Sequence, residues 1–357
     1  MLHKIKPGAE RELRKVMAFQ REVLAFACDP SIHTQCDSNN RTRLDKTEIL
    51  ARFPQTGKWL WSHSSLHDPI IKLNKVVRAN PALAQQILDA YDNDASFDQR
   101  TTDPQFRFQC CGLPNPISEE FVRLMQTFYM LLGRDGGFSV EIAGAAGINR
   151  TGVVRRFWTG NGELNVCPAC DGPRPRRSGQ RDRSQCDHFF PESKHAALSI
   201  HPLNLVPVCG ECNYDKLHRD ANDYALLSEM FAPYIREAFG PLTVEVYSGK
   251  GALLELTLKD GGDTNTPRLR ALNHVTQLTE VWTDRLRNRV SGSIVDNLSQ
   301  QKALIARLNG DRDELLFQIT AHRTGARNKR GKEQDAILKE AYFAFLEATP
   351  SARSAIP

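Results

Sequence analysis

Two Cys-x-x-Cys pairs enclose an acid–histidine pair near the middle of this 357-residue sequence. The first pair is Cys167 and Cys170, and the second is Cys209 and Cys212. Four thiolates in this arrangement indicate a closed tetrahedral Zn²⁺ site, with about 2.3 Å between metal and sulfur and no open position for chemistry. Such an ion is structural, because a unit of this size buries too little apolar surface to fold securely alone. The alternative is four unlinked thiols.

The acid–histidine pair is Asp187 and His188, in the segment between the two cysteine pairs. A closed zinc site does not explain this pair. The residue pattern predicts a strand at QCDHFFP, a second strand at NLVPVC and a helix that begins at CNYDKLHRD. In this ββα unit, Asp187 and His188 leave the first strand, and Asn213 lies in the first turn of the helix. The small core is predicted from Phe189, Leu205, Val206 and Val208.

Residues 167–219 resemble the HNH endonuclease family, in the variant that adds a four-cysteine zinc ribbon to the ββα-metal fold. The resemblance rests on the acid–histidine pair, the NLVPVC strand and the CxxCNxxK helix start, which occur in this order. It implies that His188 is the general base that takes a proton from the attacking water. It also implies that Asp187 and Asn213 bind one catalytic divalent metal ion.

The same resemblance implies roles for three more polar residues. Asn204 matches the central asparagine, whose side chain holds the loop that aims the histidine. Lys216 is expected to face the phosphate, and His218 is a reserve candidate for metal or phosphate contact. Oxygen donors suit Mg²⁺ or Mn²⁺ better than Zn²⁺. Because the reference pKa of imidazole is about 6.5, cleavage is expected to rise between about pH 6 and 7.

Less demanding interpretations stay open for these residues. An Asp–His pair often forms only a hydrogen bond at a strand end, and Asn204 also suits a turn. His195 and His201, in the loop between the two strands, are predicted to be structural or solvent-facing. The other cysteines follow no metal-ligand spacing and are predicted to be free thiols: Cys28, Cys36, Cys110, Cys111 and Cys186.

Basic residues are clustered, although the formal net charge is only +5. The insert 174–183 is expected to lie beside the proposed site, and we expect it to contact DNA rather than to be exposed to solvent without a function. Its arginines are Arg174, Arg176, Arg177, Arg181 and Arg183. A second basic stretch, residues 322–332, is more typical of a solvated charge run.

The predicted fold class is α+β, with the central ββα-metal unit and its zinc ribbon flanked by two other regions. Residues 1–135 are predicted to be mostly helical, and 136–165 to be a connector with some extended structure. The nuclease unit is placed at 166–221. Residues 222–357 are predicted to contain a helix, a β-hairpin and further helices.

Apolar periodicity predicts the individual elements of the two flanks. In the first flank it predicts helices at 8–26, from Pro81 onward, and from a cap at Ser118 to Gly133. In the second it predicts a helix from Asn222 to Ala238, a hairpin within 242–258, and helices at 269–286, 294–308, 311–321 and 333–347.

The function expected from the resemblance is metal-dependent hydrolysis of phosphodiester bonds in DNA, with RNA not excluded. The overall layout is similar to that of bacterial HNH proteins in defence and restriction. The alternative is a zinc-ribbon subunit that binds nucleic acid without cutting it. A third hypothesis is a nuclease that the flanks keep silent until a protein partner or a second copy triggers it. The charged N-terminus and the lack of an 18-residue apolar run suggest a cytoplasmic protein and no membrane partner.

Overall fold

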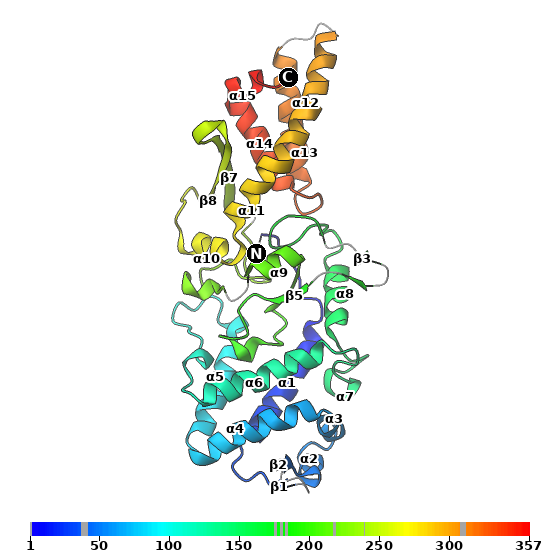
Figure 1. Ribbon diagram of the computed structural model, residues 1–357, viewed down its shortest axis with the longest axis vertical. Coiled ribbons are helices and arrows are strands. Elements are labelled where there is room, and N and C mark those ends of the chain that lie inside the picture. Colours follow the sequence, from blue (N-terminus) through cyan, green and yellow to red (C-terminus); the bar gives the residue numbers. More distant parts are fainter. Residues whose placement is uncertain are drawn as a thin grey trace.

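The computed structural model describes residues 2–36, 42–174, 185–216, 219–238, 240–307 and 312–357, and the backbone at 177–178 and 181–182. The fold is α+β, as predicted, and its sheets are two-stranded and antiparallel in the described part of the chain. Figure 1 shows three groups of elements along the long axis: N-terminal helices at one end, the strand pair β5–β6 in the middle and C-terminal helices at the other end.

The N-terminal group is mainly helical, as predicted. Its elements are α1 (Glu10–Ala27), β1 (Thr34–Cys36), β2 (Thr42–Leu44), α2 (Lys46–Arg52), α3 (Gly57–Ser62), α4 (His67–Ala79), α5 (Leu83–Ala95) and α6 (Ile117–Leu132). The apolar stripe of α6 is fully buried at Phe121, Leu124 and Phe128. This helix begins ahead of Ser118, which is therefore not its cap, and ends before Gly133 as predicted.

The connector predicted at 136–165 contains two helices, α7 (Val140–Ala143) and α8 (Arg150–Gly160). Extended structure is limited to an isolated bridge between Phe138 and Ile148. The many glycines in this segment led to the prediction of a connector, although the sequence contains the cap and the apolar residues that α8 needs. Asn149 caps α8 by accepting a 2.8 Å hydrogen bond from the Gly152 amide, and the apolar side of the helix is buried at Val153, Val154, Phe157 and Trp158.

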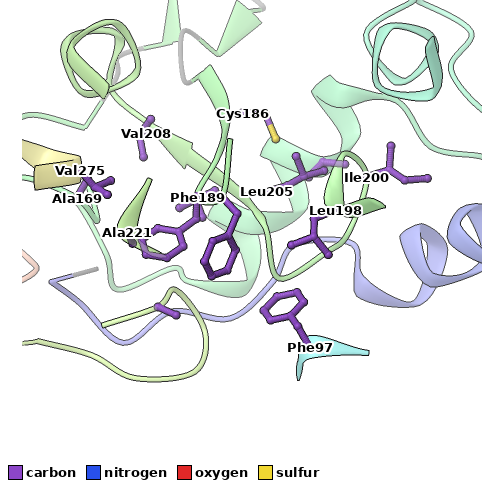
Figure 2. Close-up of a cluster of buried hydrophobic side chains, with 14 of the residues drawn as sticks. Phe97, Ala169, Cys186, Phe189, Leu198, Ile200, Leu205, Val208, Ala221 and Val275 are labelled. Atoms are coloured by element: carbon purple, nitrogen blue, oxygen red, sulfur yellow. The ribbon is translucent and has the colours of Figure 1, made fainter. Parts of the chain in front are cut away.

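The predicted ββα unit is present. Strand β5 (Gln185–His188) pairs antiparallel with β6 (Leu205–Val208), and α9 (Gly210–Lys216) follows. The predicted small core, Phe189, Leu205, Val206 and Val208, is buried. Figure 2 shows that this core is shared, because Phe97 from the N-terminal group and Val275 from α10 (Pro267–Thr276) lie in the same cluster. The unit is therefore packed into the rest of the protein.

The helix predicted from Asn222 to Ala238 is absent. A short 3₁₀ turn, η5 (Ala221–Asp223), is followed by irregular backbone through the described residues of this stretch. Pro233 lacks the amide hydrogen that a helix interior needs, and Tyr234 next to it has φ of +64°. The apolar residues Leu227, Met230 and Phe231 are nevertheless buried. Burial without helical backbone explains why periodicity was misleading here.

The C-terminal group begins with the predicted hairpin, β7 (Leu242–Ser248) and β8 (Leu254–Asp260). The helix predicted at 269–286 is divided at Gln277, whose φ of +48° separates α10 from α11 (Leu278–Arg285). A π-helical turn at Leu286–Val290 leads into α12 (Ser291–Arg307), α13 (Arg312–Asn328), α14 (Ala336–Ala348) and α15 (Pro350–Ser354). Figure 1 shows α12, α13 and α14 packed as a bundle. No described helix is long and apolar enough to cross a membrane.

Candidate functional site

The four predicted zinc ligands lie together. Their sulfur atoms are all within 4.8 Å of one another. The sulfurs of Cys167 and Cys212 are 4.0 Å apart, and those of Cys170 and Cys209 are 3.9 Å apart. A tetrahedron with metal–sulfur bonds of about 2.3 Å has edges of about 3.8 Å. The group can therefore hold a metal ion such as zinc, and it is the only cluster of His, Cys, Asp and Glu with such geometry in the described residues.

Positive charge and N–H groups surround these sulfurs. Arg285 of α11 donates to Cys170 Sγ at 3.2 Å and to the Cys170 carbonyl at 2.9 Å, while its side chain is only 10% exposed. The Cys209 amide donates to Cys167 Sγ at 3.4 Å. Four thiolates around Zn²⁺ leave two net negative charges, which a buried guanidinium offsets in part. A Cβ at Gly172 would lie 2.6 Å from the Arg285 nitrogens, so a larger residue there would displace the guanidinium.

Asp171, directly after the first cysteine pair, links that pair to distant parts of the chain. It is 1% exposed, and its carboxylate lies 2.8 Å from His3 Nε2 and accepts a 3.3 Å hydrogen bond from the Ile337 amide. Its backbone carbonyl accepts from the Asp335 amide at 3.0 Å. The first residues of the chain and the start of α14 are thus both anchored on the four-cysteine group.

The face of β5 that meets α9 carries the predicted oxygen donors. Gln185 and Asp187 are two residues apart on this strand, so their side chains point to the same face. Asp187 lies 3.2 Å from Lys216 Nζ, and Asn213 donates a 2.5 Å hydrogen bond to Gln185 Oε1. Asp187 and Asn213 therefore share one interface, as predicted. Burial raises the pKa of Asp187 and lowers that of Lys216, although each partner moderates the shift of the other.

His188 points to the other face of β5. Its Nε2 is 2.8 Å from the Ser199 carbonyl oxygen, and its ring centroid is 4.1 Å from that of Tyr129. Burial lowers the pKa of His188 to about 3, so the imidazole is neutral at ordinary pH. The predicted rise in cleavage between pH 6 and 7 assumed that this imidazole loses its proton there, and a pKa of about 3 does not support that assumption. In the described residues, no side-chain hydrogen bond or ion pair joins His188 to Asp187 or Asn213, contrary to the predicted convergence.

Asn204 holds the loop that orients His188. This asparagine is fully buried, accepts from the Phe190 amide at 2.7 Å, and donates to the carbonyls of Phe190 and Leu198 at 3.1 and 3.0 Å. Leu198 directly precedes Ser199, whose carbonyl binds the imidazole. A simple turn residue would not explain three buried hydrogen bonds, so Asn204 stabilises this loop.

Two neighbours of His188 were missed in the sequence. Tyr129 of α6 donates its hydroxyl to the Cys186 carbonyl at 2.6 Å and so fixes its ring against His188. Glu192 Oε2 lies 3.8 Å from His188 Nε2 and is buried without a hydrogen-bond partner in the described residues. Tyr129 lies beside the apolar stripe of α6, and only its long-range contact with His188 marks it as part of the site.

The basic insert is described only in part. Backbone pairing of β3 (Arg177–Ser178) with β4 (Arg181–Asp182) makes it a hairpin. The Arg174 guanidinium lies 4.1 Å from the Trp158 ring centroid of α8. Of the other predicted contacts, the side chains of Arg177 and Arg181 and the whole of Arg176, Arg183 and His218 lie outside the described residues.

The second basic stretch, 322–332, is neutralised within the chain. Arg323 pairs with Glu347, and Arg327 and Arg330 both pair with Glu340, at 2.8 and 2.5 Å. These ion pairs join α13 and the following loop to α14. They favour the interpretation that this stretch is not a nucleic-acid contact.

His195 and His201 are buried rather than solvent-facing. His195 Nε2 lies 2.6 Å from Asp220, and His201 packs 4.6 Å from the Phe97 ring centroid. The structural alternative for both is therefore supported. The described cysteines outside the metal group are free, as predicted: Cys28, Cys110, Cys111 and Cys186. The side chain of Cys36 lies outside the described residues.

Burial of His201 predicts an acid-dependent loss of stability. Burial lowers its pKa to about 3, against a smaller opposing effect of Asp98. The unfolded state therefore binds the extra proton first, and stability contributed by the neutral ring is lost as pH falls from the unfolded pKa toward 3. Between about pH 7 and 5 the free energy of unfolding should fall by about 2 kcal/mol more than in His201→Gln. Urea unfolding of both proteins at the two pH values measures this; equal losses would contradict it.

The sequence matches no family model, and neither a curated protein nor a solved structure is significantly similar to it.

Proposed function

We propose that this protein is a metal-dependent endonuclease of the HNH type that hydrolyses phosphodiester bonds in DNA. The observation that carries the proposal is the setting of His188: a neutral imidazole at the end of a ββα hairpin, oriented by a carbonyl whose loop Asn204 holds. The preceding residue, Asp187, is a carboxylate that binds a cation, the Lys216 ammonium. A base and a cation site thus lie on adjacent residues.

The donors at the β5–α9 interface fit a divalent ion. Asp187 and Asn213 would hold Mg²⁺ or Mn²⁺, which when bound would neutralise phosphate charge and stabilise the leaving oxygen. Lys216 now occupies the cation position beside Asp187. Its ammonium would leave that carboxylate and be available to the phosphate of the substrate.

His188 would act through Nδ1. Its Nε2 proton is directed to the Ser199 carbonyl, which leaves Nδ1 as the basic nitrogen. Glu192, near Nε2, would stabilise the imidazolium that forms when Nδ1 takes a proton from water. Negative phosphate charge beside the ring would raise its pKa toward the range that a general base needs.

A metal requirement tests this proposal directly. Nicking of supercoiled plasmid should need added Mg²⁺ or Mn²⁺ and fall by about 100-fold or more in Asp187→Asn, because the metal loses its only carboxylate in the proposed site. Asp68→Asn is a matched control, since Asp68 also pairs with a lysine, Lys72, but on the remote helix α4. Full activity of Asp187→Asn, or cleavage in excess chelator, would refute the proposed metal site.

A second candidate is a zinc-ribbon module that binds nucleic acid without cutting it. The observation that favours it is the placement of Asp187 and His188 on opposite faces of β5, with Asp187 already neutralised by Lys216. This candidate predicts salt-dependent binding with no metal-dependent cleavage. The plasmid experiment separates the two.

A further inference from the structure

We propose that α8 is the surface on which this protein binds duplex DNA, with Arg150 and Arg155 as phosphate contacts. The inference rests on the proposed nuclease function, because it places the substrate beside His188. Helix α8 contacts β5 and the hairpin strand β4, and Figure 1 shows α8 next to both strand pairs. A duplex on α8 would therefore lie close to the candidate site.

The exposed side of α8 is positively charged. From Arg150 to Gly162 the sequence contains three arginines and no acidic residue. Arg156 is neutralised by Glu12, 2.7 Å away on α1. Arg155 is exposed and has no ion pair with the described residues. Thr151, four residues before it, is exposed too, so one face of the helix offers a cation and a hydroxyl group.

Arg150 occupies the edge of α8 nearest to His188. Its guanidinium carbon lies 4.4 Å from the centroid of the Tyr129 ring, the same ring that packs on His188. A Cβ at Gly133 would lie 2.7 Å from Arg150 Nη2, so the glycine makes room for it. Arg150 Nε is buried without a hydrogen-bond partner in the described residues. A guanidinium that is stacked on a tyrosine ring beside the candidate site is suited to bind phosphate.

The helix is held rigidly enough to present these groups. A Cβ at Gly8 would lie 2.3 Å from the Phe157 amide nitrogen, which shows how closely the N-terminal segment packs against α8. The short helix α7 and a turn with positive φ at Gly144 and Gly147 precede α8.

Duplex DNA is the partner that fits best. The major groove of B-form DNA admits an α-helix, whereas that of A-form RNA is too narrow and deep for side chains to read. The hairpin β3–β4 extends the surface, because Arg174 before it stacks on Trp158 of α8.

Binding can be measured apart from cleavage in protein that carries His188→Ala. Fluorescence anisotropy of a labelled DNA duplex, at several salt concentrations, should show that adding Arg150→Gln or Arg155→Gln weakens binding by about 10-fold and reduces the slope of log affinity against log salt by about 1. Arg155→Lys should retain most of the affinity, because it keeps the charge. Arg323→Gln is the matched control: it removes one arginine that is already paired with Glu347 in the C-terminal bundle.

The possible results separate this inference from the proposed function. Unchanged affinity and slope in both α8 variants, while the parent binds DNA, would overturn the role of α8 even if the wild type cleaves plasmid. Equal losses with single-stranded DNA or duplex RNA would overturn duplex DNA as the preferred partner. Weakened duplex binding in the variants would support the α8 surface, even if the wild type proved unable to cleave. Thermal melts identical to the parent exclude misfolding as the cause.

Discussion

Replacement of His188 by glutamine should reduce plasmid nicking by about 10²–10⁴-fold, the usual contribution of a general base. Glutamine can still donate a hydrogen bond to the Ser199 carbonyl, which now lies 2.8 Å from the imidazole. The loop that Asn204 holds should therefore keep its structure. What is lost is the basic nitrogen, Nδ1. Initial nicking rates under saturating Mg²⁺ or Mn²⁺ measure the effect.

Two controls distinguish loss of chemistry from loss of fold. Duplex binding and zinc content of His188→Gln should equal those of the wild type, because neither the α8 surface nor the four cysteines contact this side chain. His274→Gln changes a histidine on α10 that lies near Asp223, outside the proposed site, and should leave nicking unchanged. If His188→Gln nicks plasmid at the wild-type rate, His188 is not the base and the proposed mechanism fails.

The central unit could be predicted because its signals are local. Two Cys-x-x-Cys pairs specify a metal group by type and spacing, and the short segments QCDHFFP and NLVPVC predict two strands. The role of Asn204 was implied by the family resemblance, which places an asparagine just before the second strand. The residues that form these sequence motifs are also the residues that contact one another in the structure.

The parts that could not be predicted depend on contacts between distant segments. Tyr129 meets His188 across 59 residues of sequence, and Arg285 meets Cys170 across 115. Neither the residue type nor the sequence spacing of Tyr129 and Arg285 indicates which residue each of them contacts. At 222–238, the apolar residues have helical spacing and are buried, but the described backbone is not helical. At 150–160, a capped helix was obscured by glycines, although Asn149 and the apolar residues after it are sufficient to form one.

The opposite faces taken by Asp187 and His188 are the largest departure from the family resemblance. Adjacent residues in a regular strand must point apart, so the two side chains can approach one cation only where the strand ends. His188 is the last residue of β5. A change in its backbone, or release of Lys216 from Asp187, would be needed to bring both groups to one phosphate. The metal requirement and the His188→Gln result together decide whether this occurs.

Loss of the metal should have the largest effect on stability. Structural zinc supplies on the order of 10 kcal/mol to folding, which is comparable to the whole stability of a typical domain. Cys167→Ser should therefore abolish tight zinc binding and the cooperative thermal melt of the central unit. Elemental analysis and calorimetry measure the two effects. Cys111→Ser, at an exposed free thiol, is the matched control and should change neither.

The disruption should also reach both ends of the chain. His3 and the start of α14 are anchored on Asp171, and Arg285 lies buried against Cys170. Without the metal, the sulfurs lose the geometry that places these partners, and Arg285 loses the negative charge that stabilises it. Hydrogen exchange should therefore accelerate near His3 and at 335–341 in Cys167→Ser, but not in the distant helix α4. Protection unchanged at both ends would show that the four cysteines organise only their own loops.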